Sequence, residues 1–153
     1  MPYIKIVNEN YDNDNAIDNL FGYITSCSKC GGMAGGYNVI PQYAIKMMKT
    51  VRHLYGKSDD SRLMHIILSL SSGETMSEEA MYKFSLCIAS YFYDHQVVFG
   101  VHSDTNHLHT HFMVNTVSFR DGSALKSKGE IKRNLEMFCC TALSYFGKQL
   151  PEQ

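Results

Sequence analysis

Four of the seven histidines in this 153-residue chain fall within ten residues, at positions 102–111. In an extended strand alternate side chains share one face, so His109 and His111 are expected to point the same way, about 7 Å apart. His102 ends the apolar segment 97–102, and a short turn would bring it beside that pair. Three neutral imidazoles on one face can bind a divalent metal ion and leave coordination positions open.

The residues around the histidines follow the same alternation. Asn115 is placed on the histidine face, while Phe112 and Val114 are placed on the opposite, apolar face. Asp104 can orient a ligand imidazole from outside the coordination sphere. Neutral imidazoles gain nothing from crowding, and protonated ones repel, so a metal or phosphate site explains the cluster better than packing. The other histidines are scattered and are interpreted as ordinary structural or surface residues: His53, His65 and His95.

The chemistry of three neutral imidazoles suits phosphodiesters. They leave the charge of a divalent ion uncompensated, so the ion can act as a Lewis acid on a phosphodiester oxygen. The reaction then needs a nucleophile, either water or a side chain. A tyrosine would conserve the bond energy as a phosphotyrosine, and the ten tyrosines of the chain offer candidates.

Composition indicates one globular domain rather than a disordered or membrane protein. The chain is 44% hydrophobic and 19% charged, and no apolar run approaches the roughly 20 residues of a membrane helix. No signal peptide precedes residue 15, so we expect a cytoplasmic location. The five cysteines, an odd number, favour reduced thiols. Cys27 and Cys30 have the spacing of half a zinc site or a redox pair, which is one alternative for this segment.

The net charge of −1 does not itself indicate nucleic acid, but two stretches are locally basic, 44–57 and 120–133. Charge alone favours solvated helix faces for both. Hydrophobic periodicity predicts strands over 3–7, 62–70, 97–102 and 109–118, and helices over 13–24, 41–55, 77–93 and 128–146. The glycines between 31 and 36 predict a loop. This order favours an α+β fold, with a central antiparallel sheet flanked by helices.

The pattern His102-x-Asp104-x-x-x-x-His109-x-His111-x-x-x-Asn115 resembles the third motif of relaxases, the DNA-strand transferases of conjugative and mobilisable elements. Relaxases belong to the HUH endonuclease superfamily. Segment 18–25 resembles their first motif, and segments 47–57, 62–70 and 115–122 resemble later parts of the family in the same order. The MOB-P class is the nearest likeness, and the resemblance covers nearly the whole chain.

This resemblance implies a site and a reaction. It implies Tyr23 and Asp104 as catalytic residues, Asn115 as a supporting residue, and three metal ligands, His102, His109 and His111. Tyr23 would attack a phosphate of single-stranded origin DNA and form a 5′-phosphotyrosyl intermediate. One divalent ion is implied, Mg²⁺ or Mn²⁺, although three imidazoles suit Zn²⁺ as well. The base that ionises Tyr23 is left open, as is any role of Tyr11 or Tyr37 as a second nucleophile.

The resemblance also implies partners and an organisation. Residues 1–153 would form one relaxase domain, either the N-terminal domain of a longer protein or a minimal relaxase. The partners would be single-stranded origin DNA with an adjacent hairpin, accessory relaxosome proteins and a coupling protein. Many relatives have a Lys-Thr pair after the tyrosine, where this chain has Cys27 and Cys30 with Lys29 between them. The candidate DNA contacts are basic side chains: Lys29, Lys46, Lys49, Arg52, Lys57, Arg120, Lys126 and Lys128.

Two other functions remain as alternatives. A relaxase-like accessory module would bind origin DNA without cutting it, but such a module has no need of the histidines and Tyr23. A histidine-triad nucleotide hydrolase would use the alternation His107-Leu-His109-Thr-His111 without a metal. That family prefers an apolar residue at position 110, and it gives His102 no role. Metal dependence and the effect of Tyr23→Phe separate the hydrolase from the relaxase.

Overall fold

A computed structural model describes residues 2–9, 11, 13–26, 33–57, 63–70, 76–103, 105, 107–125 and 127–147. Its centre is a five-stranded antiparallel sheet in the spatial order β1-β3-β5-β4-β2. The strands are β1 Tyr3–Ile6, β2 Ala34–Tyr37, β3 Leu63–Ser69, β4 Val97–His102 and β5 His109–Asn115. The helices are α1 Asp14–Thr25, α3 Ala44–Leu54, α4 Glu78–Ala89 and α5 Lys128–Gly147, with short 3₁₀ turns at Pro41–Tyr43 and Ser90–Phe92. The predicted α+β fold with a central antiparallel sheet is confirmed.

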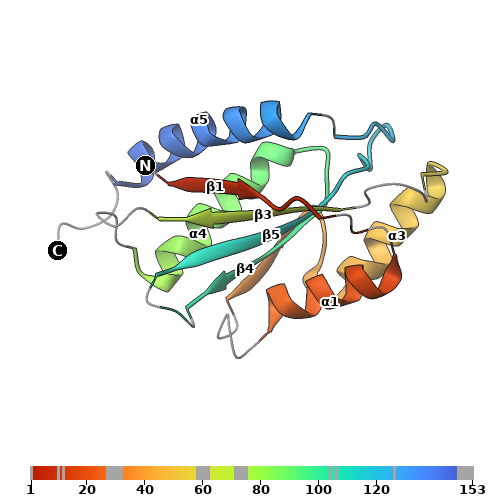
Figure 1. Ribbon diagram of the computed structural model, residues 1–153, viewed down its shortest axis with the longest axis horizontal. Coiled ribbons are helices and arrows are strands. Elements are labelled where there is room, and N and C mark those ends of the chain that lie inside the picture. The colour runs from red at the N-terminus through yellow and green to blue at the C-terminus, as the bar shows by residue number, and fades with distance from the viewer. Residues whose placement is uncertain are drawn as a thin grey trace.

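Helices cover both faces of this sheet (Figure 1). On one face α4 and α5 pack with Phe84 and Leu135 against Phe112. On the other face α1 and α3 bury Ile17 and Met48 in the same cluster as Met113 of β5. Because the central strands are covered on both sides, β3 is an almost continuous apolar run rather than an alternating one.

The strand β2 corrects one prediction, since Gly35 and Gly36 were expected in a loop and instead pair with β4 at the edge of the sheet. Glycine is required at position 35 because an added Cβ would lie 2.6 Å from a ring carbon of Phe99 and 2.7 Å from the hydroxyl of Tyr82. Close approach of these rings, rather than a turn, therefore explains that glycine.

The predicted helix starts are confirmed at two N-caps. The side chain of Asn13 accepts a hydrogen bond from the backbone of Ala16 at 2.9 Å, and Ser77 accepts one from Ala80 at 3.1 Å. The cysteines in the described part of the chain, Cys87, Cys139 and Cys140, are not in disulfides, as expected, while Cys27 and Cys30 lie outside the described residues. Among the described helices, none has the length and apolar character needed to cross a membrane.

Candidate active site

The histidine cluster is assembled by the hairpin of β4 and β5. His102 is the direct cross-strand partner of His109, and His111 follows on the same face of β5. The ring centroids are 5.4 Å apart for His102 and His109, 4.5 Å for His102 and His111, and 5.1 Å for His109 and His111. One ring nitrogen from each lies within 4.8 Å of the others. The predicted turn thus brings His102 beside the pair.

Backbone carbonyls determine which nitrogen of two of these rings carries the proton. Nε2 of His102 donates to the carbonyl of Ile24 at 3.0 Å, and Nδ1 of His109 donates to the carbonyl of His107 at 3.1 Å. A carbonyl oxygen can only accept, so each of these nitrogens must bear the hydrogen. Nδ1 of His102 and Nε2 of His109 therefore keep the lone pairs that a metal ion binds, and the donor set fits a divalent ion.

Tyr23 lies over this cluster from α1. Its ring centroid is 5.2 Å from that of His102 and 5.0 Å from that of His111, edge to face in both cases. Its side chain is 42% exposed, whereas Tyr11 is only 7% exposed. The helix is held in place because its apolar stripe, which includes Ile17 and Ile24, is buried against the sheet. A nucleophile must reach its substrate, and of these two tyrosines near the histidines Tyr23 is the exposed one.

Gly100 of β4 permits the close approach of α1 to the sheet. A Cβ at this position would collide with the carbonyl oxygen of Ile24, the oxygen that accepts the hydrogen bond from His102. The absence of a side chain at Gly100 therefore lets one backbone carbonyl both contact β4 and orient a histidine. Tyr23 is the residue before Ile24, so the same contact sets its distance from the cluster.

We expect Gly100→Ala to lower about 100-fold the rate of the DNA cleavage that the resemblance implies, because a displacement of about 1 Å in a catalytic group costs this much. The added methyl group should also destabilise the fold by roughly 1–3 kcal/mol through overpacking. Thermal unfolding and single-turnover cleavage measure the two effects. Gly22→Ala in α1 is the matched control, since a Cβ there meets nothing within 4 Å. Wild-type cleavage by Gly100→Ala would refute the positioning role.

His65 is a member of this site that its sequence context did not reveal. Its Nε2 lies 2.8 Å from Nδ1 of His111, and its Nδ1 lies 2.9 Å from the hydroxyl of Tyr11. Burial, followed by the nearby charges of His102 and Lys5, lowers the pKa of His65 to about 4, so its ring is neutral near pH 7. The interpretation of His65 as an ordinary structural histidine did not include this contact with a candidate ligand. The sequence did contain one indication of this role. His65 is a single imidazole within an apolar strand, and a buried imidazole needs a hydrogen-bond partner.

The remaining scattered histidines do fit the ordinary interpretation. His95 is buried, its Nδ1 lies 2.8 Å from the carbonyl oxygen of Asn115, and its pKa is lowered mainly by burial. His53 is exposed on α3.

Asn115 shares the histidine face of β5, but its hydrogen bonds lead elsewhere. Its amide nitrogen donates to the side chain of Gln96 at 3.0 Å and to the carbonyl of Met48 at 3.3 Å. Its side-chain oxygen accepts from the backbone of Val117 at 3.3 Å. Asn115 therefore ties α3 to the far end of β5. Asp104, predicted as a catalytic residue, lies outside the described residues.

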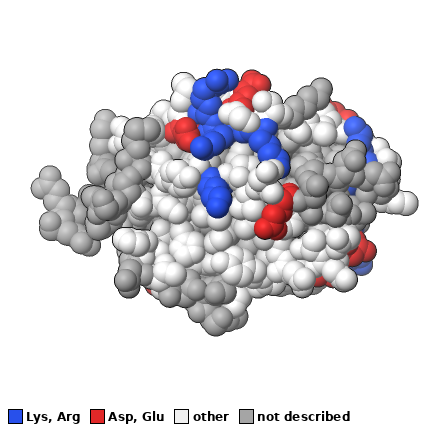
Figure 2. Space-filling view, in the orientation of Figure 1, with Lys and Arg blue, Asp and Glu red and all other residues white. Residues whose placement is uncertain are grey.

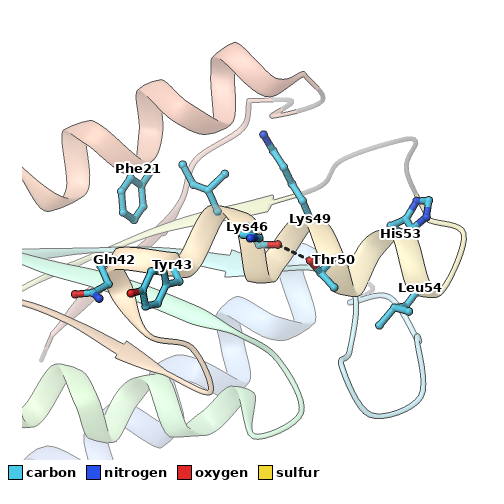
Figure 3. Close-up of a pocket in the computed structure, with 9 residues that line it drawn as sticks. Phe21, Gln42, Tyr43, Lys46, Lys49, Thr50, His53 and Leu54 are labelled. Carbon is cyan, nitrogen blue, oxygen red and sulfur yellow. Dashed lines mark hydrogen bonds between the residues drawn. The ribbon is translucent and has the colours of Figure 1, made fainter.

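A groove of about 690 Å³ runs between α1 and α3. Figure 3 shows Phe21 reaching down from α1, with Tyr43 in the 3₁₀ turn before α3 and Lys46 and Lys49 on α3. Aromatic rings beside cations are suited to a nucleic acid strand, since bases stack on the rings and phosphates pair with the cations. At 100° per residue, Phe21 and Tyr23 lie on opposite sides of the buried stripe of α1. The groove is therefore across the helix from the histidines.

The other predicted DNA contacts are dispersed. Arg52 is a correction, because its side chain is only 4% exposed and donates to the carbonyl of Lys57 at 2.7 Å, which makes it a structural residue. Arg120 is exposed but lies 3.2 Å from a carboxylate oxygen of Asp94. Lys57 and Lys128 are exposed in separate places, and Lys29 and Lys126 lie outside the described residues.

Among the residues that the structure describes, Lys and Arg form no broad basic surface on the face in Figure 2. Its basic side chains gather near the top, over α5 and β1, and acidic side chains lie among them. Most of the face below is uncharged. Long-range attraction of DNA to this face would therefore be weak, and binding must depend on local contacts.

Residues 23–143 match the family described as "Relaxase: MobA/VirD2-like, nuclease domain", a span that includes Tyr23 and all three clustered histidines. The chain belongs to this relaxase family. It is 30% identical over 109 residues to the protein rlx of Staphylococcus aureus, which covers 68% of this chain and 34% of that protein. It is 29% identical over 82 residues to the protein TraI of Escherichia coli, which covers 52% of this chain and 11% of that protein. The chain thus spans about a third of the length of the first relative.

Proposed function

We propose that this chain is a metal-dependent relaxase domain. It would use Tyr23 to nick one DNA strand at a transfer origin, with that strand bound in single-stranded form. The observation that carries the proposal is the position of the exposed Tyr23 ring, 5.0 Å from His111 and 5.2 Å from His102. A tyrosine beside a metal-binding set of imidazoles is the combination that phosphodiester transesterification requires. The match to the relaxase family supports the proposal independently of this geometry.

In the proposed reaction the Tyr23 oxygen attacks the scissile phosphorus. A bond forms between that oxygen and phosphorus, and the bond from phosphorus to the 3′ oxygen of the preceding nucleotide breaks. The tyrosine hydroxyl loses its proton and the leaving 3′ oxygen gains one, so no oxidant or reductant is needed. The product is a 5′-phosphotyrosyl link and a free 3′ hydroxyl. Attack by a 3′ hydroxyl reverses the step, which allows strand transfer.

The residues of the chain have separate parts in this step. His102, His109 and His111 would hold one divalent ion, Mg²⁺, Mn²⁺ or Zn²⁺, which supplies Lewis-acid activation of the phosphate. The carbonyl of Ile24 holds the ring of His102 in the orientation that directs Nδ1 away from α1. His102 and His111 are buried, and each would serve as a ligand in its neutral imidazole form.

The wider setting is part of the same proposal. Residues 1–153 act as one relaxase domain in the cytoplasm, on origin DNA with an adjacent hairpin. Accessory relaxosome proteins and a coupling protein would complete the assembly.

Covalent capture tests the proposal directly. The wild-type chain is incubated with a library of single-stranded oligonucleotides and Mn²⁺, then denatured and examined for protein–DNA adducts. We expect an adduct that disappears with a chelator, and sequencing of the trapped DNA would give the nick site. Binding of oligonucleotides without an adduct at any divalent ion tested would contradict cleavage and favour the non-cutting accessory module.

We further propose that the groove between α1 and α3 holds part of the DNA strand through Lys46 and Lys49. Loss of two phosphate contacts should lower the slope of log affinity against log salt by about 1.4 for single-stranded DNA. Lys46→Ala/Lys49→Ala is therefore expected to bind several-fold more weakly at low salt, as measured by fluorescence anisotropy.

The matched control for this pair is Lys83→Ala/Lys132→Ala. It removes the same charge from α4 and α5, where each lysine lies near a glutamate four residues away, at 3.4 Å and 3.8 Å. The pairs are comparable in this respect, since Lys49 lies 3.7 Å from a carboxylate oxygen of Asp14. If both double variants weaken binding equally, the effect is net charge and the groove does not bind the strand.

A further inference from the structure

Three hydrogen-bonding side chains lead away from the histidine cluster. His111 contacts His65 through Nδ1 at 2.8 Å, and His65 contacts the hydroxyl of Tyr11 through its other nitrogen at 2.9 Å. Tyr11 in turn lies beside the carboxylate of Glu9. Glu9 and Tyr11 line the same cavity, and burial, followed by the charge of Glu9, raises the pKa of Tyr11 to about 12. The chain of contacts therefore runs from a candidate ligand to an acid at the surface.

The first link differs from those of the other two ligands. His102 and His109 each donate to a carbonyl, which leaves only one tautomer possible. His111 instead meets another imidazole, which can either donate or accept. If His65 donated, the proton of His111 would lie on Nε2 and block its use as a ligand. His111 can bind a metal through Nε2 only if its Nδ1 carries the proton and donates to His65.

The far end of the chain selects this direction. A carboxylate can only accept, so Tyr11 donates its proton toward Glu9 and its oxygen accepts from Nδ1 of His65. An imidazole that donates through Nδ1 to Tyr11 and carries one ring proton has Nε2 as its acceptor. That acceptor faces Nδ1 of His111. Every link is satisfied when protons point from His111 toward Glu9.

We propose that His65 and Tyr11, anchored by Glu9, are positioning residues that hold His111 in the tautomer that binds the metal. Outer partners of this kind fix the ring and tautomer of a ligand histidine, and their loss costs 10–100-fold in metal affinity. We call His65, Tyr11 and Glu9 the relay. These three residues line one cavity of about 410 Å³ together with Tyr23, so the relay lies on the Tyr23 side of α1. This inference rests on the proposed metal site, but not on Tyr23 as nucleophile.

Two measurements on the chain without DNA test the relay. Calorimetric titration with Mn²⁺ should show affinity falling 10–100-fold in His65→Leu and about 10-fold in Tyr11→Phe. His65→Gln should recover most of the loss, because its amide oxygen can accept from Nδ1 of His111. Tyr55→Phe is the matched control, since it removes a tyrosine hydroxyl that donates to the carbonyl of Phe119 at 3.0 Å.

Long-range ¹H–¹⁵N correlation spectra of the metal-free chain report the tautomer itself. We expect the Nδ1–H form for His111 in the wild type and a mixture of forms in Tyr11→Phe. The Nε2–H form in the wild type would overturn the proposal, as would equal Mn²⁺ affinities for His65→Leu and His65→Gln. These spectra involve neither DNA nor cleavage. The spectra can therefore contradict the relay while DNA nicking is observed, and the absence of nicking does not contradict the relay.

Discussion

Tyr23→Phe is expected to abolish the covalent protein–DNA adduct and to leave oligonucleotide binding within about twofold of wild type. Phenylalanine has no oxygen to bond to phosphorus, so the loss should exceed 1,000-fold rather than be partial, on the order of what removal of a covalent nucleophile costs. The ring itself remains, and with it the edge-to-face contacts with His102 and His111. The substitution therefore removes the reacting atom and preserves the packing of α1.

Denaturing gels after incubation with Mn²⁺ and the selected oligonucleotide measure this result, and calorimetry shows whether Mn²⁺ still binds. Tyr145→Phe is the control, because Tyr145 is 64% exposed on α5, which does not line the groove with Lys46. It should form the adduct at the wild-type rate. An adduct that persists in Tyr23→Phe would move the nucleophile to another residue and refute this part of the proposal.

The second large effect is expected from His109→Ala/His111→Ala. Removal of two of three ligands should lower Mn²⁺ affinity at least 100-fold and reduce cleavage to the level seen with a chelator. The nitrogens of these histidines and His102 lie within 4.8 Å of one another, so no single remaining imidazole reproduces the site. Calorimetry with Mn²⁺ and single-turnover cleavage measure the two losses.

Folding must be shown to survive, because His111 is only 4% exposed and its loss leaves a cavity. The thermal midpoint gives this check, and His109→Ala alone is the milder variant, since His109 is half-buried. His107→Ala is the control from the same segment: its side chain is exposed, and the backbone carbonyl that orients His109 is retained. Cleavage retained by the double variant would exclude the histidine cluster from the reaction.

Local patterns were enough to predict much of this protein. The two-residue period of a strand placed His109 and His111 on one face, and the short turn placed His102 opposite them. The capping side chains of Asn13 and Ser77 marked the helix starts, because a cap bonds within three residues of itself. These features depend on neighbours in the chain, so sequence spacing determines them.

The contacts of His65, Gly35 and Gly100 depend on segments that are distant in the sequence, so only the tertiary structure could show them. His65 contacts His111 because β3 pairs with β5, 46 residues away, in one register that the sequence of neither strand specifies. Gly35 was predicted in a loop because its sequence neighbours are glycines, whereas the rings of Tyr82 and Phe99 are what require it. Glycine is likewise required at position 100 because the backbone carbonyl of Ile24 in α1 contacts it. The sequence alone proposed the candidate ligands and the candidate nucleophile. Strand register and close packing decided how these side chains are oriented, because those contacts join residues that no local spacing connects.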